Sequence, residues 1–491
     1  MEDPYRYKVI CDPVHNEIPI SKLEQELIDS PSFQRLRNLK QLGLASLVYP
    51  NATHTRFAHS LGVFRLMSRV IDLFVNREHF SADDKKKLRI AALLHDIGHY
   101  PYSHLMEFLD RDQTMRPNML RKKSPAASPP AAVSAYPSHE DVGKLIILKR
   151  HDISDVLDSA GIDPAEIASI IRAEHTNAAY NRLIHSSLDV DRMDYLVRDS
   201  LGTGVPYGRI DIDYILSNLD IIKEKLEDID STNVVEGEPG KRAGETVDIV
   251  LSSKAETAAE HFLVARYFMH KAVYFHKTTF GFEALLRHIL FMLRDRKHIY
   301  ADGSDVEAMI ADDAGFLAFH DGYVDSKVQE FARESSSEPL VDLCRLLINR
   351  TPPKLLHQVA ALKESGQPMA AEYALFRKDR IEKIKELSER HGIPNEFWIW
   401  EDLPKEVSFE SLGPFVALSQ ISDLKPEETA ELIRVKTSSG EVRKLVDDQN
   451  SIIHHLSKLR LQMSRLYLAK PVDKSKLEEI RAEVRAWAKP D

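Results

Sequence analysis

At 491 residues the chain is long enough to bury a large core and to form two to four structural units. Its 43% apolar and 29% charged residues are typical of an ordinary globular protein, and a formal net charge of −10 disfavours polyanion binding through bulk charge. Two cysteines, Cys11 and Cys344, exclude a disulfide framework, and no apolar run or leader-like segment indicates a membrane partner, so we expect a cytoplasmic protein.

The first part of the chain predicts one hairpin followed by helices. β-Forming residues alternate weakly over Tyr7–Ile20, which predicts the hairpin. Apolar residues recur at helical spacing over Ser21–Leu42 and again from Phe64 to Phe74. His59 lies near the first turn of the helix that contains the second of these patterns.

The segment Ala91–His104 concentrates polar chemistry behind an apolar helical turn. Small and apolar residues run directly into His95 and Asp96, and His99 and His104 follow. Polar groups beside an apolar run must find partners, and the glycine and proline that come next end the helix. Taken alone, the histidine–aspartate pair also fits capping and loop residues that bind no metal.

His59 and Asp191 change that interpretation. Together with His95 and Asp96 they offer two imidazoles and two carboxylates to one divalent cation. Such a mixed set of nitrogen and oxygen ligands suits manganese, iron, zinc or magnesium, and it leaves positions open for water and a phosphate oxygen. The sequence therefore predicts a single-metal site for phosphoester hydrolysis.

Two helical faces indicate a phosphorylated substrate. Helical spacing places four residues on the first face: Asp191, Tyr195, Arg198 and Asp199. It places four more on the second: Arg266, His270, Tyr274 and Lys277. Arginine anchors phosphate bidentately, and an aromatic ring packs on a sugar or base. The alternatives are a solvated face for the first set and a subunit interface for the second.

The remaining segments carry fewer chemical signals. Residues 111–138 are rich in serine, proline and alanine, which predicts a flexible insertion that is either a linker or a lid. Ser138 caps the next predicted helix. Further helices are predicted over Asp163–Glu174, Ile210–Leu226, Glu256–Arg294, Phe376–Arg390 and Val442–Trp487, with surface turns over Glu236–Glu245 and turns and strands over Pro394–Ser411.

The segments around the predicted ligands resemble the HD phosphohydrolase superfamily. Thr55-Arg56-Phe57-x-His59-Ser60-Leu61-Gly62-Val63 and His95-Asp96-x-Gly98-His99-x-Pro101-x-Ser103-His104 are similar to its deoxynucleoside triphosphate triphosphohydrolase branch. That branch includes bacterial dNTP hydrolases and the vertebrate enzyme that joins a sterile-alpha-motif domain to an HD domain; no sterile-alpha-motif domain is visible here. The resemblance is dense over residues 7–295 and weak beyond 300.

The resemblance implies a mostly α fold, with an HD-domain helical core, short β hairpins and a mixed, mainly helical C-terminal region. It implies a catalytic region over residues 1–300, interrupted by the 111–138 insertion. Residues 301–491 would then serve assembly and regulation.

The resemblance also implies roles for individual residues. The metal ligands are His59, His95, Asp96 and Asp191. Phosphate contacts come from Arg56, Arg192, Tyr195 and Arg266, with His270 beside them. Gln41 and Asp199 hold the sugar 3′-hydroxyl, and Leu42 and Tyr274 crowd the 2′ position. His104, with His99, His139 and Glu107, is the acid/base and positioning group beside the α-phosphate.

Three departures from the family pattern bear on nucleotide preference. Arg192 stands where the family commonly has lysine, Glu107 where it has aspartate, and Ala58 where glutamate is frequent. None of them removes a predicted ligand.

An activator site is implied in the same way. Lys8, Val9, Asp29, Gln34 and Arg37 match a guanine-nucleotide activator site, and Lys254 and Lys277 match part of an adjacent effector site. The alternative is that these residues are ordinary surface groups.

The predicted function is metal-dependent hydrolysis of dNTPs to deoxynucleoside and inorganic triphosphate. It would use one divalent ion (Mn, Fe, Mg or Zn) and an activating GTP or dNTP, in a homo-oligomer that is a dimer or a tetramer. Nucleic acid is not an expected partner. One alternative is an HD phosphohydrolase, such as a 5′-nucleotidase, acting on another nucleotide. The other is a nucleotide-sensing or nucleic-acid-binding scaffold with a vestigial site. The presence of every predicted metal ligand argues against this alternative, because a vestigial site usually loses one.

Overall fold

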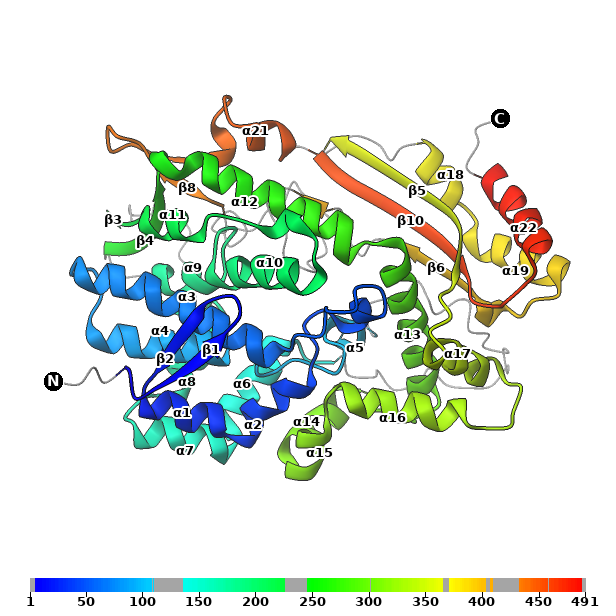
Figure 1. Ribbon diagram of the computed structural model, residues 1–491, viewed down its shortest axis with the longest axis horizontal. Coiled ribbons are helices and arrows are strands. Elements are labelled where there is room, and N and C mark those ends of the chain that lie inside the picture. Colours follow the sequence, from blue (N-terminus) through cyan, green and yellow to red (C-terminus); the bar gives the residue numbers. More distant parts are fainter. Residues whose placement is uncertain are drawn as a thin grey trace, which may run out of the picture.

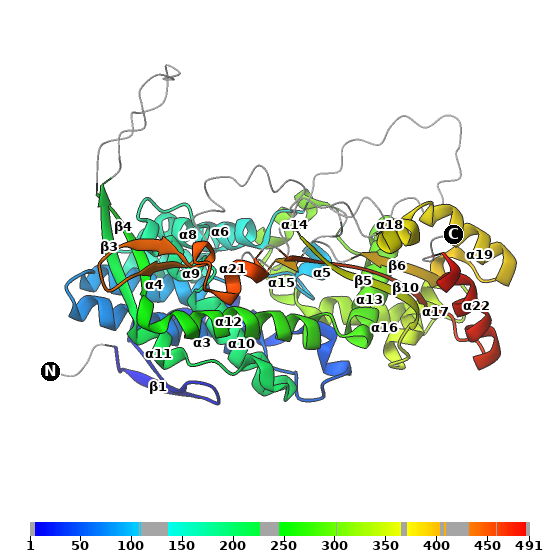
Figure 2. The same ribbon diagram turned by 90° about the horizontal axis from the view of Figure 1, so that it is seen from above.

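The protein is described by a computed structural model that covers residues 5–107, 109, 136–225, 245–300, 302–364, 371–402, 407–408, 432–457 and 459–487. It is mostly helical, with three small sheets (Figure 1). The molecule is elongated, with one four-stranded sheet toward each end and helices between them (Figure 2).

Three helices form the core that carries the predicted ligands. α3 (Arg56–Asn76) begins at the N-cap Thr55, and α4 (Ala82–Leu94) begins at a capping box. α10 (Val190–Thr203) ends at Gly204, whose φ of 75° is the left-handed conformation that stops a helix. α3 packs against both α4 and α10. The apolar faces of these helices are buried, which fixes the relative positions of their polar ends.

The N-terminal hairpin lies against this core. β1 (Lys8–Asp12) pairs antiparallel with β2 (Asn16–Ile20), and β2 contacts α3. The turn between the strands places Asn16 at a φ of 60°. The hairpin predicted over Tyr7–Ile20 is therefore confirmed.

Further helices surround the core and connect it to the second half of the chain. In the first half they are α1 (Lys22–Asp29), α2 (Pro31–Gln34), η1 (Arg35–Asn38), η2 (Gly43–Leu47), α5 (His104–Glu107), α6 (His139–Lys149), α7 (His151–Ser159), α8 (Pro164–Ile171), α9 (Ala178–Ile184), η4 (Pro206–Gly208) and α11 (Ile212–Ser217). They continue with η5 (Ser253–Ala255), α12 (Glu256–Met269), η6 (His270–Tyr274), α13 (Lys277–Asp295), α14 (Gly303–Ala311), α15 (Asp313–Ala318), α16 (Asp321–Ala332), α17 (Pro339–Ile348), α18 (Ala371–Arg377), α19 (Arg380–His391), η7 (Asn395–Phe397), η9 (Leu445–Asp447), α21 (Ile452–Leu456) and α22 (Lys474–Ala486).

Both four-stranded sheets join segments that are far apart in sequence. In one, β3 (Leu219–Lys225) pairs with β4 (Glu245–Ser252), which pairs in parallel with β8 (Arg434–Lys436), followed by β9 (Val442–Lys444). In the other, β10 (Leu459–Leu468) lies between β5 (Lys354–Glu364) and β6 (Trp398–Asp402), and β7 (Val407–Ser408) also pairs with β10. The C-terminal residues thus contribute strands to both ends of the molecule (Figure 1).

Several predicted helices differ from the structure. Ser21–Leu42 is divided into α1, α2 and η1, and Phe376–Arg390 is divided between α18 and α19. The helix predicted over Ile210–Leu226 is wrong in its second half, where β3 lies, and the helix predicted over Val442–Trp487 is wrong where β10 lies. Residues 463–468 of β10 are all buried, so no period-two pattern marks that strand. β3 does alternate, because Leu219 and Ile221 are buried and Asp220 and Ile222 are less so.

Other predictions agree with the structure or fall outside it. Ser138 caps α6, and the helices predicted over Asp163–Glu174 and Glu256–Arg294 are present. Residues 111–135 of the predicted insertion and residues 236–244 of the predicted surface turn lie outside the described residues. Among the described helices, none has the length and apolar character needed to cross a bilayer.

Candidate metal centre and active site

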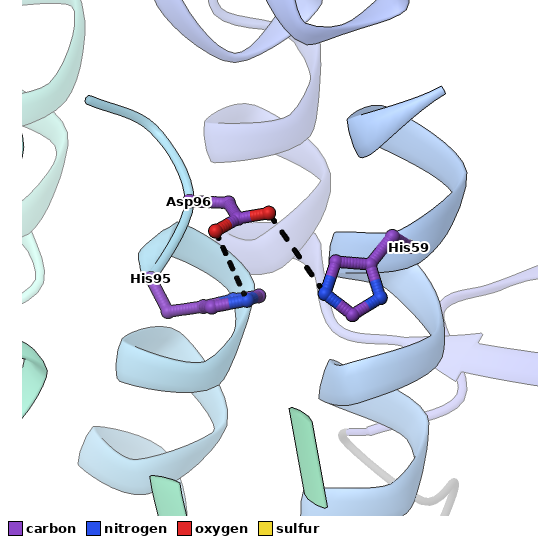
Figure 3. A group of neighbouring side chains, drawn as sticks. All are labelled: His59, His95 and Asp96. Carbon is purple, nitrogen blue, oxygen red and sulfur yellow. Dashed lines mark ion pairs between the residues drawn. The ribbon is translucent and has the colours of Figure 1, made fainter. Parts of the chain in front are cut away.

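Three of the four predicted metal ligands form one buried cluster. His59, His95 and Asp96 place one ligand atom each within 4.8 Å of one another (Figure 3). His59 comes from the first turns of α3, and His95 and Asp96 follow the last residue of α4. The packing of α3 on α4 therefore brings the histidine and the histidine–aspartate pair together, as Figure 3 shows.

Asp191, the fourth predicted ligand, joins the cluster from the first turn of α10. Its Oδ1 lies 2.9 Å from His59 Nε2 and 3.9 Å from His95 Nε2. Its side chain is 34% exposed, whereas the other three are almost fully buried, so the cluster opens to solvent on the Asp191 side. A substrate would approach from that side.

The donor atoms fit a divalent cation. His95 Nδ1 is bonded to the carbonyl of Ala92 at 2.9 Å, so its other ring nitrogen is directed into the cluster. That nitrogen, Nε2, is buried and has no hydrogen-bond partner, and it lies 3.5 Å from Asp96 Oδ1. An orphaned imidazole nitrogen facing carboxylates is the arrangement expected of a metal ligand.

The charges of the cluster favour ionised carboxylates. Burial raises the pKa of Asp96, but the Arg56 guanidinium, at 2.6 Å, and the neighbouring histidines outweigh it and bring the pKa well below its ordinary range. Burial lowers the pKa of His59, but hydrogen bonds to Asp191 and Asp194 outweigh it and raise the pKa to about 10. Metal binding at this cluster would therefore displace a proton from His59.

A second cluster lies beside the first and contains the predicted acid/base residues. Glu107 Oε2 lies 2.9 Å from His104 Nδ1 and 3.2 Å from His139 Nδ1. His99 stacks on His139 with ring centroids 4.2 Å apart, and its Nε2 lies 3.0 Å from Asp96 Oδ1. His99 thus joins the two clusters into one continuous site.

The backbone before His104 adopts an uncommon conformation. Tyr102 and Ser103 have φ angles of 51° and 52°, the left-handed region that residues with side chains rarely occupy. The Tyr102 N–H donates to Asp321 Oδ1 at 2.8 Å, and Arg56 Nε donates to Ser103 Oγ at 2.9 Å. These bonds hold a strained turn that directs His104 toward His139.

The predicted phosphate-binding residues form a cationic group near the metal cluster. Arg266 is fully buried and Arg192 nearly so. Burial, followed by Arg266 and Arg192, lowers the pKa of His270 to about 3, so this imidazole is neutral between two guanidinium groups. Both of its ring nitrogens are buried without a hydrogen-bond partner. Tyr195 is half-buried, and burial raises its pKa.

The predicted sugar-binding residues meet around Asp199. Its carboxylate accepts a hydrogen bond from the Tyr274 hydroxyl at 2.6 Å and lies 2.8 Å from His54 Nε2. Gln41 lies beside His54, because its backbone N–H donates to the His54 carbonyl. Its side-chain Oε1 is buried without a hydrogen-bond partner. Leu42 follows it and packs on the core. His54 was not predicted, since one isolated histidine in a loop gives no periodic signal.

The second predicted face is not one continuous helix. His270–Tyr274 forms a π-helical turn between α12 and α13, a feature that recurs at functional sites. The turn brings His270 and Tyr274 into contact, with ring centroids 4.7 Å apart. Lys277 lies beyond the turn, at the start of α13, and is exposed. The spacing predicted the contact between the rings but not the break.

The predicted effector residues lie on the surface and show no shared site by themselves. Lys8, Val9 and Lys254 are exposed, as are Asp29 and Arg37. Gln34 is half-buried and bonded at both ends: its Nε2 donates to the Ile28 carbonyl at 2.7 Å, and its Oε1 accepts from Arg37 Nε at 2.6 Å. An effector role for these seven residues stays a prediction.

Two protein families match segments of the chain that contain most of this site. The HD domain family matches residues 56–199, and the HD-associated region family matches residues 243–336. The first match contains all four predicted metal ligands. The chain is thus similar to the HD domain family over the segment that holds the histidine–aspartate cluster, and to the HD-associated region family further along.

Named relatives share different portions of the chain. YwfO of Bacillus subtilis is 29% identical over 97% of this chain and 96% of its own length. MJ1154 of Methanocaldococcus jannaschii is 33% identical over 64% of this chain, and this chain spans 54% of its length. The deoxynucleoside triphosphate triphosphohydrolase SAMHD1 of Bos taurus is 44% identical over 103 residues, which are 20% of this chain and 18% of that protein.

Solved structures share the fold over nearly the whole chain. A phosphohydrolase from Bacteroides thetaiotaomicron has a TM-score of 0.63 and 24% identity, with 94% of this chain and 99% of that chain covered. A hypothetical protein from Aquifex aeolicus has a TM-score of 0.62 and 25% identity, with 97% and 99% covered. The likeness in fold thus extends beyond the segments that the two families match.

Proposed function

We propose that this protein hydrolyses deoxynucleoside triphosphates to deoxynucleoside and inorganic triphosphate with one divalent metal ion. The observation that carries the proposal is that the cluster of predicted metal ligands lies directly beside the cluster of predicted acid/base residues. The His59–His95–Asp96–Asp191 cluster adjoins the imidazoles held by Glu107. The short, 44% identical match to the triphosphohydrolase SAMHD1 of Bos taurus supports the choice of substrate.

The residues of this chain divide the chemistry between them. A divalent cation in this site would polarise a phosphoryl oxygen and lower the pKa of a bound water. Arg192 and Arg266 neutralise the charge of the triphosphate, which a neutral His270 can approach without repulsion. Tyr274 and Asp199 meet the sugar.

Proton transfer falls to His104. Its Nδ1 is bonded to Glu107, which leaves Nε2 to carry the proton that is donated. Burial lowers the pKa of His104, so its protonated form is a stronger acid than a histidine imidazolium in water. As the bond between the α-phosphorus and the 5′-oxygen breaks, that proton passes to the 5′-oxygen. The oxygen of a water molecule forms the new bond to phosphorus, and the proton that this water gives up restores the one lost by His104, so the products are deoxynucleoside and triphosphate.

We also propose that a nucleotide activates the protein as a homo-oligomer. The support is the match of Lys8, Val9, Asp29, Gln34 and Arg37, with Lys254 and Lys277, to effector positions of the family that the motifs resemble. Size-exclusion chromatography with light scattering, with and without GTP, tests it. A larger assembly that forms with GTP, accompanied by faster hydrolysis, is expected, and no change in either would contradict it.

The decisive experiment identifies the products. Purified protein is treated with chelator, reloaded with Mn²⁺ or Mg²⁺, and incubated with each dNTP and rNTP in the presence and absence of GTP. Deoxynucleoside and triphosphate are expected to appear together, without a monophosphate or diphosphate intermediate. Stepwise release of phosphate would contradict the proposal, and hydrolysis of monophosphates alone would favour a 5′-nucleotidase.

Matched variants test the site assignment. His95→Ala is expected to lose metal and at least about 100-fold of the activity, because it removes the buried ligand atom. His151→Ala, which removes a surface histidine on α7, serves as the control and should behave as the parent protein. Full activity in His95→Ala would rule out the assigned metal centre.

A further inference from the structure

Asp194 is a fully buried carboxylate on α10, one turn after the predicted ligand Asp191, and it is bound on both oxygens. Its Oδ2 lies 2.7 Å from His59 Nδ1, and its Oδ1 lies 2.6 Å from His15 Nε2. Arg198 donates to both oxygens, from Nε at 2.8 Å and from Nη2 at 2.9 Å. Each oxygen of Asp194 thus lies within hydrogen-bond distance of one histidine nitrogen and of Arg198, and the carboxylate is placed to accept from both histidines.

The N-terminal hairpin supplies one side of this arrangement. Asp12 Oδ1 accepts the N–H groups of Val14 and His15, both at 2.9 Å, and so closes the turn between β1 and β2. The other oxygen of Asp12 accepts from Arg198 Nη1 at 2.9 Å. Asp12 therefore both folds the turn and fixes Arg198, and the folded turn presents His15 to Asp194.

Gly62 shows that room is made for this carboxylate. It lies one turn after His59 in the middle of α3, where glycine costs about 1 kcal/mol relative to alanine. A Cβ at this position would overlap Asp194 Oδ1 and Arg198 Nη2. The lack of a side chain at Gly62 on α3 thus leaves the space that Asp194 and Arg198 of α10 occupy.

We propose that Asp194 and His15 are positioning residues of the metal centre, which makes the N-terminal hairpin part of that centre. Asp194 accepts the Nδ1 proton of His59, and this fixes the tautomer in which Nε2 carries the lone pair for the metal. His15 holds Asp194 from the opposite side. The inference rests on the metal centre of the proposed function, and it adds two residues that touch neither metal nor substrate.

Metal affinity tests the inference independently of activity. Competition between the full-length protein and a chromogenic chelator for Mn²⁺ alone gives the dissociation constant. Loss of a group that orients a metal-binding histidine weakens metal affinity by about 10- to 100-fold, and we expect this for His15→Ala and for Asp194→Asn. His15→Gln should recover part of the loss, because its amide N–H can still donate to Asp194.

A control on the same hairpin separates positioning from general stability. Arg6→Ala breaks the exposed Arg6–Glu17 ion pair and should leave Mn²⁺ affinity unchanged. Affinities of His15→Ala and Asp194→Asn that equal the parent value would overturn the inference and leave the metal centre intact. A parent protein that binds no divalent metal would instead overturn the proposed metal centre.

A spectroscopic measurement on the unaltered protein covers the case in which a variant does not fold. With ¹⁵N-labelled histidine and diamagnetic Zn²⁺, NMR reports which His59 nitrogen carries the proton. A protonated Nδ1 is expected in the metal-loaded protein. A proton on Nε2, with the metal on Nδ1, would contradict the role assigned to Asp194.

Discussion

Glu107 shows how one carboxylate can serve two imidazoles. Burial raises its pKa, but the hydrogen bonds from His104 and His139 outweigh it and bring the pKa below its ordinary value, so it is ionised at neutral pH. In return it raises the pKa of His139 against the effect of burial. Glu107 therefore fixes both the orientation and the charge of the acid/base cluster.

Replacing Glu107 should impair the chemical step without removing the metal. Glutamine cannot accept hydrogen bonds from two Nδ1–H groups with one carbonyl oxygen as well as a carboxylate can, so Glu107→Gln is expected to lower kcat by about 10- to 100-fold. Metal content measured by mass spectrometry should equal that of the parent protein. Glu107→Asp, which keeps the charge, should retain more activity, and equal activity in all three proteins would contradict this role.

Tyr274 allows a test of sugar selectivity. If its ring crowds the 2′ position, Tyr274→Ala should raise kcat/KM for rNTPs relative to dNTPs by about tenfold or more. Tyr274→Phe keeps the ring and loses only the hydroxyl that donates to Asp199, so it should keep the preference for deoxyribose. The ratio of the two rates for each variant is the measurement, and an unchanged ratio in Tyr274→Ala would remove this residue from the sugar site.

At the scale of residues, the sequence predicted those site residues that are neighbours along the chain or that recur at helical spacing. His95, Asp96, His99 and His104 were identified because they crowd one short segment. Asp194 and His15 were not assigned roles, because their partnership spans 179 residues and depends on how the hairpin docks. A glycine in the middle of α3 was the one sequence signal that a buried group lies opposite.

Elements with their own periodicity and caps were predictable, whereas strands buried on both faces were not. α3 and α6 begin at N-caps that the sequence displays and carry clear apolar faces. β10 was assigned to a helix because its residues from Ser464 to Leu468 are all buried, which removes the alternation that would identify a strand. Its pairing with β5 and β6 depends on segments about 60 to 115 residues away in sequence, beyond the reach of local patterns.

α13 contains a half-buried glutamate that should make stability depend on pH. Burial, with a contribution from Glu401, raises the pKa of Glu283 from 4.5 to about 7, while Arg287 opposes the change. Below pH 4.5 the residue is protonated in both the folded and the unfolded chain. Between pH 4.5 and 7 only the unfolded chain ionises readily, so Glu283 increasingly destabilises the fold as pH rises.

Glu283→Gln should remove this destabilisation. We expect a gain on the order of 2 kcal/mol at pH 8, seen as a higher midpoint of thermal unfolding, and almost no gain at pH 4. Glu307→Gln, which changes an exposed residue of α14, is the control and should be neutral at both pH values. An equal shift at both pH values would show that the effect does not come from ionisation.

At the scale of the whole molecule, the proposed metal centre joins α3, α10 and the residues directly after α4, which are distant parts of the chain. A cation bound there would stabilise only the folded protein, by about 2.7 kcal/mol at a free concentration of 100 times its Kd. Adding Mn²⁺ to chelator-treated protein should therefore raise the unfolding midpoint by several degrees. Asp191→Ala should show little or no rise, and an equal rise in both proteins would place the stabilising ion elsewhere.

β10 also contacts the backbone beside His270 and Tyr274, which belong to the proposed substrate site. Arg465 Nη2 donates to the carbonyl of Phe275 at 2.8 Å, and the Tyr467 hydroxyl donates to the carbonyl of Lys277 at 3.0 Å. These bonds hold the backbone directly after the π turn that carries His270 and Tyr274. During synthesis on the ribosome, the motif-bearing helices emerge hundreds of residues before this strand. A nascent chain that already displays its histidines thus has no brace behind Tyr274 until β10 has left the exit tunnel.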